Sequence, residues 1–340
     1  MLFPVFFGPA ATCGTYASMT LPASMDIVSA ASNGTGTLIA AKSGGVGSAS
    51  IIYSTNGGAT WTAANGTNTG GYGFVIAQWI DGRFIVREGS GYNQIQYSAN
   101  GIDWTTTTGT YTVPTTDIAP GVNEAVSVTV GASDYMLVSG GTESSSDTSF
   151  WSTLDGVDYV KRNLLPYSGD WGAMCKSPST VLMVMREFAA AATDKIATHT
   201  YDGNLLTTAW TGRTTSQVPT IKWFHAFYNG RCFFLAENST TKACRSYDEG
   251  ATFENVTLPS AENRLMVCNP ETGAILVAGG NVAVPTTSGY CSLDDGDTWD
   301  AVSIVENKVW QTGLFDSNSN ILLVFGSTDY AGTKGARASV

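Results

Sequence analysis

The stretch Cys291-Ser-Leu-Asp-Asp-Gly-Asp-Thr-Trp299 has the composition of a strand end, a tight turn and the start of the next strand. Asp side chains bond nearby backbone N–H groups and glycine supplies a positive φ, so Asp294-Asp295-Gly296 predicts a hairpin turn. Ser292 can bond across this turn, and Trp299 can pack the hairpin onto its neighbour. The stretch therefore predicts two antiparallel strands.

The same phrase recurs along the chain. Two further copies match closely, Tyr53 to Trp61 and Arg245 to Phe253. Looser copies occupy Tyr97 to Trp104, Trp151 to Tyr159 and Thr200 to Leu206, the last without the closing aromatic residue. With Leu206 taken as the weak member, the residues that close the phrases lie 43 to 55 positions apart. A period in the forties with four strands per unit is typical of a β-propeller.

The phrase Ser-x-Asp-x-Gly-x-Thr-Trp resembles the Asp-box, or BNR repeat, of sialidase-like propellers. The resemblance implies an all-β fold with Asp-box hairpins but no particular activity, because the box is a structural turn in enzymes and non-enzymes alike. After six units, residues 309–316 and 321–326 repeat the first two strands of a blade, and 335–340 supplies a third. Gly14 to Pro22 aligns with Ala251 to Pro259 and supplies the fourth. We predict a seven-bladed β-propeller with four-stranded antiparallel blades, its ring closed by an N-terminal strand joining the C-terminal blade.

This assignment divides the chain into an N-terminal apolar segment, residues 1–13, and a single propeller domain, residues 14–340. The segment carries apolar side chains that no blade accommodates, namely Leu2, Phe3, Val5, Phe6 and Phe7. Two interpretations stay open: the segment folds back to cover one end of the propeller channel or form an extra strand, or it anchors the propeller to a neighbouring subunit or another virion protein. It lacks a basic n-region and Pro4 interrupts it, so we expect no signal peptide, and no run is long enough to span a membrane.

Charge and cysteine spacing exclude several classes of function. The formal net charge of −11 and the absence of any Lys/Arg cluster argue against nucleic-acid binding. His199 and His225 have no partner at metal-ligand spacing, so we expect polar packing for both, with no metal and no cofactor. The six cysteines lack CxxC spacing and most lie in apolar runs, which favours buried free thiols over disulfides; they are Cys13, Cys175, Cys232, Cys244, Cys268 and Cys291.

Three glutamates follow the predicted second strand of blades two, four and five, namely Glu88, Glu187 and Glu237. A glycosidase needs two carboxylates beside the scissile bond, and propeller enzymes place their site near these strand ends. Arg87 and Arg186 precede two of the glutamates. The cluster has two interpretations, an acid/base site or Arg–Glu pairs that satisfy polar loops around the channel, and we favour the structural one.

The chain departs from the sialidase pattern at its catalytic residues. That family uses an arginine triad, a Tyr–Glu nucleophile pair, an Asp acid and an Arg-Ile-Pro motif in the first blade. This sequence has no Arg-Ile-Pro and no arginine before Arg83, so we expect no sialidase activity. Loop aromatic residues can stack on sugars or pack between blades; they are Tyr72, Tyr92, Tyr167 and Trp171.

The repeats are also similar to those of bacteriophage tail, nozzle or fibre proteins that present a propeller. We therefore predict a non-catalytic structural or adhesion protein of a virion, made in the host cytoplasm. Its expected partners are other virion proteins, copies of itself or a host-surface glycan, contacted through residues such as Arg87, Arg186, Tyr92 and Trp171. The alternative is a glycan-active enzyme or lectin in a bacterial cytoplasm or at a bacterial surface.

Overall fold

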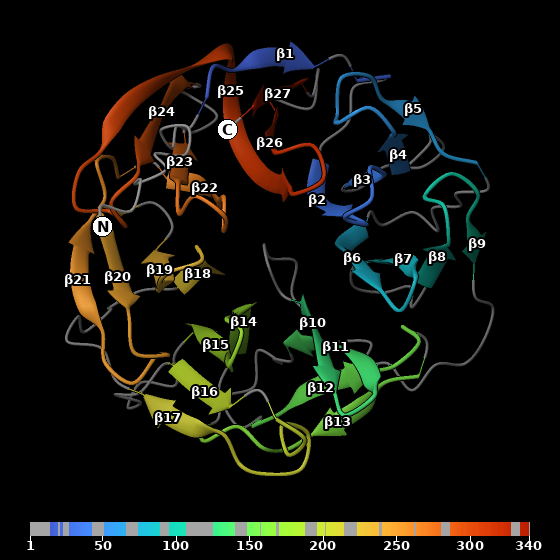
Figure 1. Cartoon of the computed structure of the whole chain (residues 1–340), viewed down its shortest axis with the longest axis vertical. Coiled ribbons are helices and arrows are strands. Elements are labelled where there is room, and N and C mark those ends of the chain that lie inside the picture. Colours follow the sequence, from blue (N-terminus) through green and yellow to red (C-terminus); the bar gives the residue numbers. More distant parts are fainter. Residues whose placement is uncertain are drawn as a thin grey trace, which may run out of the picture.

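The computed structural model describes most of the predicted strands and the short turns between them. The described residues are 14–19, 21–22, 27–42, 51–65, 74–88, 95–106, 125–139, 148–156, 158–167, 170–187, 196–200, 202–213, 223–237, 240–261, 263–279, 286–327 and 334–339. They contain strands and turns but no helix. The strands form four-stranded antiparallel blades around a common axis (Figure 1). The predicted seven-bladed β-propeller is confirmed.

Six blades have their strands in chain order, with the first strand near the axis and the fourth on the rim (Figure 1). Five of them are separate sheets, and the sixth shares β25 with blade 7. Blade 1 contains β2 (Ile27–Ser32), β3 (Leu38–Lys42), β4 (Ile51–Ser54) and β5 (Thr62–Ala63). Blade 2 contains β6 (Phe74–Ile80), β7 (Arg83–Glu88), β8 (Ile95–Ser98) and β9 (Thr105–Thr106). Blade 3 contains β10 (Ala125–Val130), β11 (Ser133–Ser139), β12 (Phe150–Thr153) and β13 (Val160–Arg162).

Blade 4 contains β14 (Asp170–Lys176), β15 (Thr180–Glu187), β16 (Ile196–Thr200) and β17 (Thr211–Arg213). Blade 5 contains β18 (Trp223–Tyr228), β19 (Phe233–Glu237), β20 (Lys242–Ser246) and β21 (Glu254–Thr257). Blade 6 contains β22 (Asn263–Cys268), β23 (Ile275–Gly279), β24 (Thr286–Ser292) and the first part of β25 (Asp300–Asp316). The second part of β25 begins blade 7, so one 17-residue strand serves two blades that the sequence predicted with separate strands.

The first and last described segments of the chain close the ring. Blade 7 continues with β26 (Ile321–Ser327) and β27 (Lys334–Ser339), and its fourth strand is β1 (Ala17–Met19). β1 pairs antiparallel with β27, with Ser18 opposite Ala336. Figure 1 shows the blue β1 on the rim beside the red C-terminal strands. The pairing that the sequence predicted for residues 14–22 is therefore present.

The hydrophobic core lies between adjacent blades. One cluster joins Met19, Leu323 and Phe325 of blade 7 to Leu38 and Trp61 of blade 1. The second strand of a blade is buried on both faces, which explains why β19 reads Phe-Phe-Leu-Ala-Glu without polar alternation. The blades are thus held together by side chains, since their backbone hydrogen bonds run mostly within each sheet.

The recurring phrase folds as a side-chain-capped turn, named here the repeat turn, between the third and fourth strands of a blade. In blade 1, Ser54 Oγ accepts the Gly58 N–H at 2.9 Å and the Trp61 indole N–H donates to the Gly58 carbonyl at 3.0 Å. Gly58 has φ +77°, and a Cβ there would lie 2.3 Å from Leu323 of blade 7. The same hydroxyl-to-amide bond, at 2.7–2.9 Å, joins Ser98 to Gly101, Thr153 to Gly156, Ser246 to Gly250 and Ser292 to Gly296.

Blade 4 departs from the predicted pattern. The sequence placed its fourth strand at 206–211 with Leu206 in the aromatic position, but the strand is β17, and Trp210 directly precedes it. Trp210 is 3% exposed and packs on Phe150 with ring centroids 5.1 Å apart. The connection from Thr200 to Trp210 spans ten positions, against seven from Ser54 to Trp61. The longer turn moved the aromatic residue out of the expected register.

Two further expectations need correction. Cys291 is buried, as its apolar surroundings indicated, but it is disulfide-bonded instead of a free thiol. The apolar residues around a cysteine predict its burial, but they do not predict whether a second sulfur lies within bonding distance. The other described cysteines are free, as expected. Trp299, which the sequence predicted to pack the hairpin onto its neighbour, does lie beside Phe234 at 6.4 Å between ring centroids but is only partly buried.

The repeat-turn tryptophans should therefore differ in their contributions to stability. Trp61 is 6% exposed and lies in the core between blades 7 and 1, so Trp61→Ala should cost about 3–5 kcal/mol. Trp299→Ala, made as the matched control, should cost roughly half as much because the ring already contacts water. Chemical denaturation of both variants beside the unaltered chain measures the difference. Equal losses would show that burial does not set the contribution of this position.

Candidate functional site

The predicted glutamate cluster lies at corresponding ends of three strands. Glu88, Glu187 and Glu237 are the last residues of β7, β15 and β19. The side chains of Glu88 and Glu187 lie outside the described part of the structure. Glu237 is fully buried, and its Oε2 accepts the Thr240 hydroxyl at 2.9 Å. In this position Glu237 is a packed polar residue that a solvent-borne substrate does not reach.

Of the predicted binding residues, two are described and buried, and the side chains of the others lie outside the described part of the structure. Arg87 is 4% exposed, and its guanidinium carbon lies 5.8 Å from the centre of the Tyr159 ring in blade 3. Trp171 is 2% exposed and belongs to the core between blades 3 and 4, so it packs between blades and offers no face to a sugar. The Arg186 side chain and Tyr92 lie outside the described residues, as do Leu2, Phe3, Val5, Phe6 and Phe7.

His225 is a further buried ionisable group, on the inner strand of blade 5. The imidazole on β18 is 1% exposed, and neither ring nitrogen has a hydrogen-bond partner among the described residues. Burial lowers its pKa from 6.5 to about 4, because the charged form loses its hydration. The sequence predicted polar packing for His225, but the neutral ring is packed without a polar partner.

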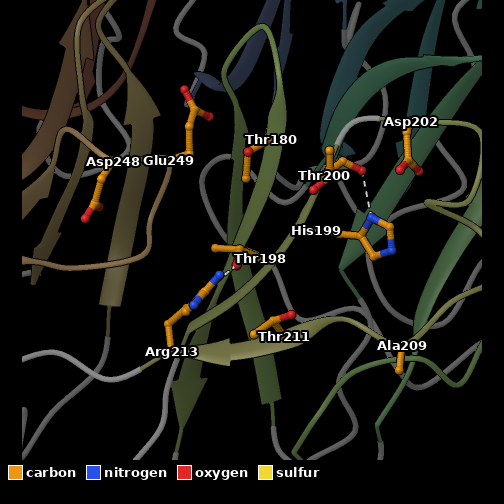
Figure 2. A pocket seen from close by; sticks show the side chains of 10 residues that line it. All are labelled: Thr180, Thr198, His199, Thr200, Asp202, Ala209, Thr211, Arg213, Asp248 and Glu249. Carbon is orange, nitrogen blue, oxygen red and sulfur yellow. Dashed lines mark hydrogen bonds between the residues drawn. The ribbon is translucent and has the colours of Figure 1, made fainter.

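A polar pocket of about 250 Å³ lies between blades 4 and 5, and we name it the seam pocket (Figure 2). It opens at the turn end of the ring, defined here as the end that carries the repeat turns and the turns between first and second strands. The lining residues are Thr180, Thr198, His199, Thr200, Asp202, Ala209, Thr211, Arg213, Asp248 and Glu249. His199 and Asp202 stand on one flank and Asp248 and Glu249 on the other (Figure 2).

The longer repeat turn of blade 4 supplies one wall of the seam pocket. Asn204 N–H donates to Asp202 Oδ1 at 2.8 Å, and the Thr208 hydroxyl donates to the Asn204 carbonyl at 3.1 Å, which holds the extra residues in a compact turn. The repeat turn of blade 5, with Asp248 and Glu249, forms the opposite wall. The extension that displaced the aromatic residue is therefore the feature that shapes the pocket.

Hydrogen bonds fix the charged side chains on the blade-4 wall. His199 Nδ1 lies 2.7 Å from the Thr200 carbonyl, and because a carbonyl only accepts, Nδ1 carries the hydrogen. Its Nε2 lies 2.7 Å from the Thr208 hydroxyl. The Arg213 guanidinium donates from Nε to Thr198 Oγ1 at 3.0 Å, as the dashed line in Figure 2 shows. The His199 and Arg213 side chains are thus turned toward their own blade.

The carboxylates of the blade-5 wall are held differently. Asp248 Oδ1 accepts the Thr252 N–H at 2.8 Å and Oδ2 accepts the Thr252 hydroxyl at 2.6 Å, which caps the repeat turn. These bonds to the ionised form lower the pKa of Asp248 although partial burial acts to raise it. Glu249 accepts the Ser177 hydroxyl at Oε2. No hydrogen bond or ion pair to its second oxygen, Oε1, occurs within the described part of the chain.

Sequence reasoning identified only part of this site. The sequence predicted polar packing for His199 and no functional role for Arg213 or Glu249. The one available signal was the irregular fourth repeat, whose missing aromatic residue indicated a turn of different length. Across the described ranges, no group of three or more His, Cys, Asp or Glu side chains is placed to hold a metal ion. The same ranges contain no helix long and apolar enough to cross a membrane.

No protein-family model matches this chain, and no curated protein matches its sequence. Solved structures match its fold. YCF48 bound to a D1 peptide covers all of both chains with a TM-score of 0.64 and 14% identity. Virginiamycin B lyase from Staphylococcus aureus covers 96% of this chain and 99% of its own, with a TM-score of 0.65 and 12% identity. Similarity at this level identifies the class, a β-propeller, and leaves the function to the site.

The burial of His225 predicts an acid-sensitive fold. Between pH 6.5 and about 4 the unfolded chain binds a proton at this residue that the folded chain does not bind, so stability falls as pH falls. The shift corresponds to about 3 kcal/mol across that window. Denaturation of the unaltered protein and of His225→Phe at pH 7 and pH 4 measures the effect. The variant should lose about 3 kcal/mol less, and equal losses would contradict a neutral, unpartnered imidazole.

Proposed function

We propose that this β-propeller is a non-catalytic binding protein of a larger assembly, a structural or adhesion component of a virion, and that its partner docks at the seam pocket. Fixed polar groups around a concave surface provide orientation and specificity. A catalytic acid or base, by contrast, must exchange a proton with the substrate. The observation that carries the proposal is that the pocket's ionisable side chains are already engaged by neighbouring groups, as His199 and Arg213 are.

The structural neighbours support a polypeptide as the partner. One YCF48 propeller is bound to a D1 peptide, which shows that this architecture recognises peptide chains in another protein. The virion assignment rests on the likeness of the repeats to Asp-box propellers of phage tails and fibres. The apolar segment 1–13 is proposed as the anchor that joins the propeller to its assembly, through Leu2, Phe3, Val5, Phe6 and Phe7.

Glycan hydrolysis is the outcome that would replace this proposal. Its candidate carboxylates are Glu88, Glu187 and Glu237, and streptogramin B lyase shows that the propeller fold can carry catalysis in another chain. In this chain, the described carboxylate of the three is enclosed by protein. We therefore give binding precedence over hydrolysis.

Two parallel assays test the proposed function. Full-length protein and a chain lacking residues 1–12 are immobilised and exposed to lysate of the cells that produce the protein, and the stoichiometry of retained partner is measured. We expect the full chain to retain both the assembly component that is joined through segment 1–13 and the partner that docks at the seam pocket. The truncated chain, still folded, should release the first and keep the second. The same preparations are incubated with a glycan panel, and we expect no reducing sugar. Sugar release that Glu→Gln substitution at position 88, 187 or 237 abolishes, with the fold intact, would contradict a non-catalytic role.

A further inference from the structure

The seam between blades 5 and 6 shows how this propeller satisfies a carboxylate at the turn end. Asp295, in the repeat turn of blade 6, is 6% exposed and has a positive φ of 59°. Its Oδ1 lies 2.8 Å from an Arg231 guanidinium nitrogen and accepts the Asn229 amide at 2.6 Å. Its Oδ2 accepts the Tyr247 hydroxyl at 3.1 Å. Blade 5 thus supplies both a cation and a neutral donor to this carboxylate.

The seam between blades 4 and 5 repeats this geometry one blade earlier. Glu249 occupies the repeat-turn position of Asp295 and has the same left-handed backbone, with φ 57°. Its carboxylate accepts the Ser177 hydroxyl, as Asp295 accepts the Asn229 amide. A carboxylate at the turn position and a neutral donor from the preceding blade are therefore common to both seams.

The neutral donors, Asn229 and Ser177, lie in the turns between the first and second strands of blades 5 and 4. These two turns have the same pattern of hydrogen bonds. Asn229 Oδ1 accepts the N–H groups of Arg231 and Cys232 at 3.1 and 2.9 Å. Ser177 Oγ accepts the N–H groups of Ser179 and Thr180 at the same two distances. Ser179 is therefore the counterpart of Arg231 in the earlier blade.

The seam between blades 4 and 5 also lacks a counterpart of a second arginine, Arg245. Arg245 precedes the repeat-turn serine of blade 5 and reaches across to blade 6, where it donates to the Asp295 carbonyl at 2.9 Å and to Asp297 Oδ1 at 2.7 Å. Its counterpart in blade 4 is His199, which instead bonds within its own blade. No described cation contacts the Glu249 carboxylate, and the seam pocket opens beside it.

We infer that the seam pocket accepts a guanidinium or ammonium group from a basic side chain of a partner polypeptide, which takes the place beside Glu249 that Arg231 takes beside Asp295. Three carboxylates line the pocket, those of Asp202, Asp248 and Glu249, and the Arg213 guanidinium in its lining is tied to Thr198. A basic group is therefore the complementary charge. This inference rests on the proposed function, since it names the chemistry of the partner at the same site.

The backbone conformation at Glu249 indicates that its carboxylate has a role, because glycine would fit this turn position better. A left-handed φ is disfavoured for a non-glycine residue, and blade 1 has Gly57, φ 63°, at the same turn position. In blade 6 the disfavoured residue places a carboxylate within reach of Arg231. Glu249 provides the same carboxylate, but the cation must come from outside the blade-4 turn.

The charge of the ligand is tested with a matched pair of small probes. N-acetyl-arginine methylamide and its uncharged isostere, N-acetyl-citrulline methylamide, are titrated into full-length protein while backbone amide signals are followed by NMR. The arginine probe should shift the signals of Glu249 and Gly250 and saturate with a dissociation constant of about 1 mM. The citrulline probe should bind at least tenfold more weakly. Equal binding of the two probes would overturn the inference.

Three variants locate the interaction. Glu249→Gln keeps the acceptor for Ser177 and should weaken the arginine probe at least tenfold, whereas Glu271→Gln, which removes an exposed turn-end carboxylate of blade 6, should leave it unchanged. Ser179→Arg installs the side chain found at Arg231 and should abolish binding by filling the pocket. Unchanged binding in both Glu249→Gln and Ser179→Arg would refute the site.

The proposed binding role and the basic-group assignment can be contradicted independently of each other. If the full chain retains a partner whose stoichiometry neither Glu249→Gln nor Ser179→Arg alters, the binding role stands and the basic-group assignment is wrong. If the arginine probe binds as expected but no partner is retained in the capture assay, the pocket chemistry stands and the proposed assembly role is wrong.

Discussion

A ring of blades is stable only if its first and last blades meet, and in this protein three residue pairs between β1 and β27 tie the chain that enters blade 1 to blade 7. β1 also contributes side chains to two inter-blade cores: Met19 packs into the seam of blades 7 and 1, and nearby Tyr16 into the seam of blades 6 and 7. Tyr16 is 2% exposed, and its burial raises the pKa of the phenol well above 10. A short N-terminal segment thus removes an open sheet edge and completes two of the hydrophobic seams.

With the ring closed, the seams share one packing scheme and differ in the side chains that cross the turn end. Between blades 7 and 1, Gly58 leaves room for Leu323, and an apolar contact fills the space. Between blades 5 and 6, Arg231 and Arg245 cross to a carboxylate and to backbone carbonyls. Between blades 4 and 5, the corresponding positions hold Ser179 and His199, and His199 bonds within its own blade. The seam pocket lies in the space that no described arginine fills. The repeated fold therefore acts as an internal reference, because a group that satisfies one seam indicates the chemistry that another leaves open.

The repeat phrase predicted the architecture because its information is local: serine, Asp or Asn, glycine and an aromatic residue are each required by the turn that they form. The closure was predictable because residues 14–22 repeat the same local pattern. The site was less accessible. The extra length of the blade-4 turn obscured the position of Trp210, and the pairing of Glu249 with Ser177 joins residues 72 positions apart. The burial of Arg87, Trp171 and Glu237 likewise depends on neighbouring blades, and Cys291 on a sulfur contact that no spacing rule indicated.

The closing strand provides the most direct test of this account. Residues 14–22 are deleted from the otherwise full-length chain, and the thermal unfolding midpoint and the sedimentation behaviour are measured beside the unaltered protein. Loss of the fourth strand of blade 7 should expose the edge of β27 and open two hydrophobic seams, so we expect a lower midpoint and association into oligomers or aggregates. A deleted chain that remains monomeric with an unchanged midpoint would contradict a ring closed by β1.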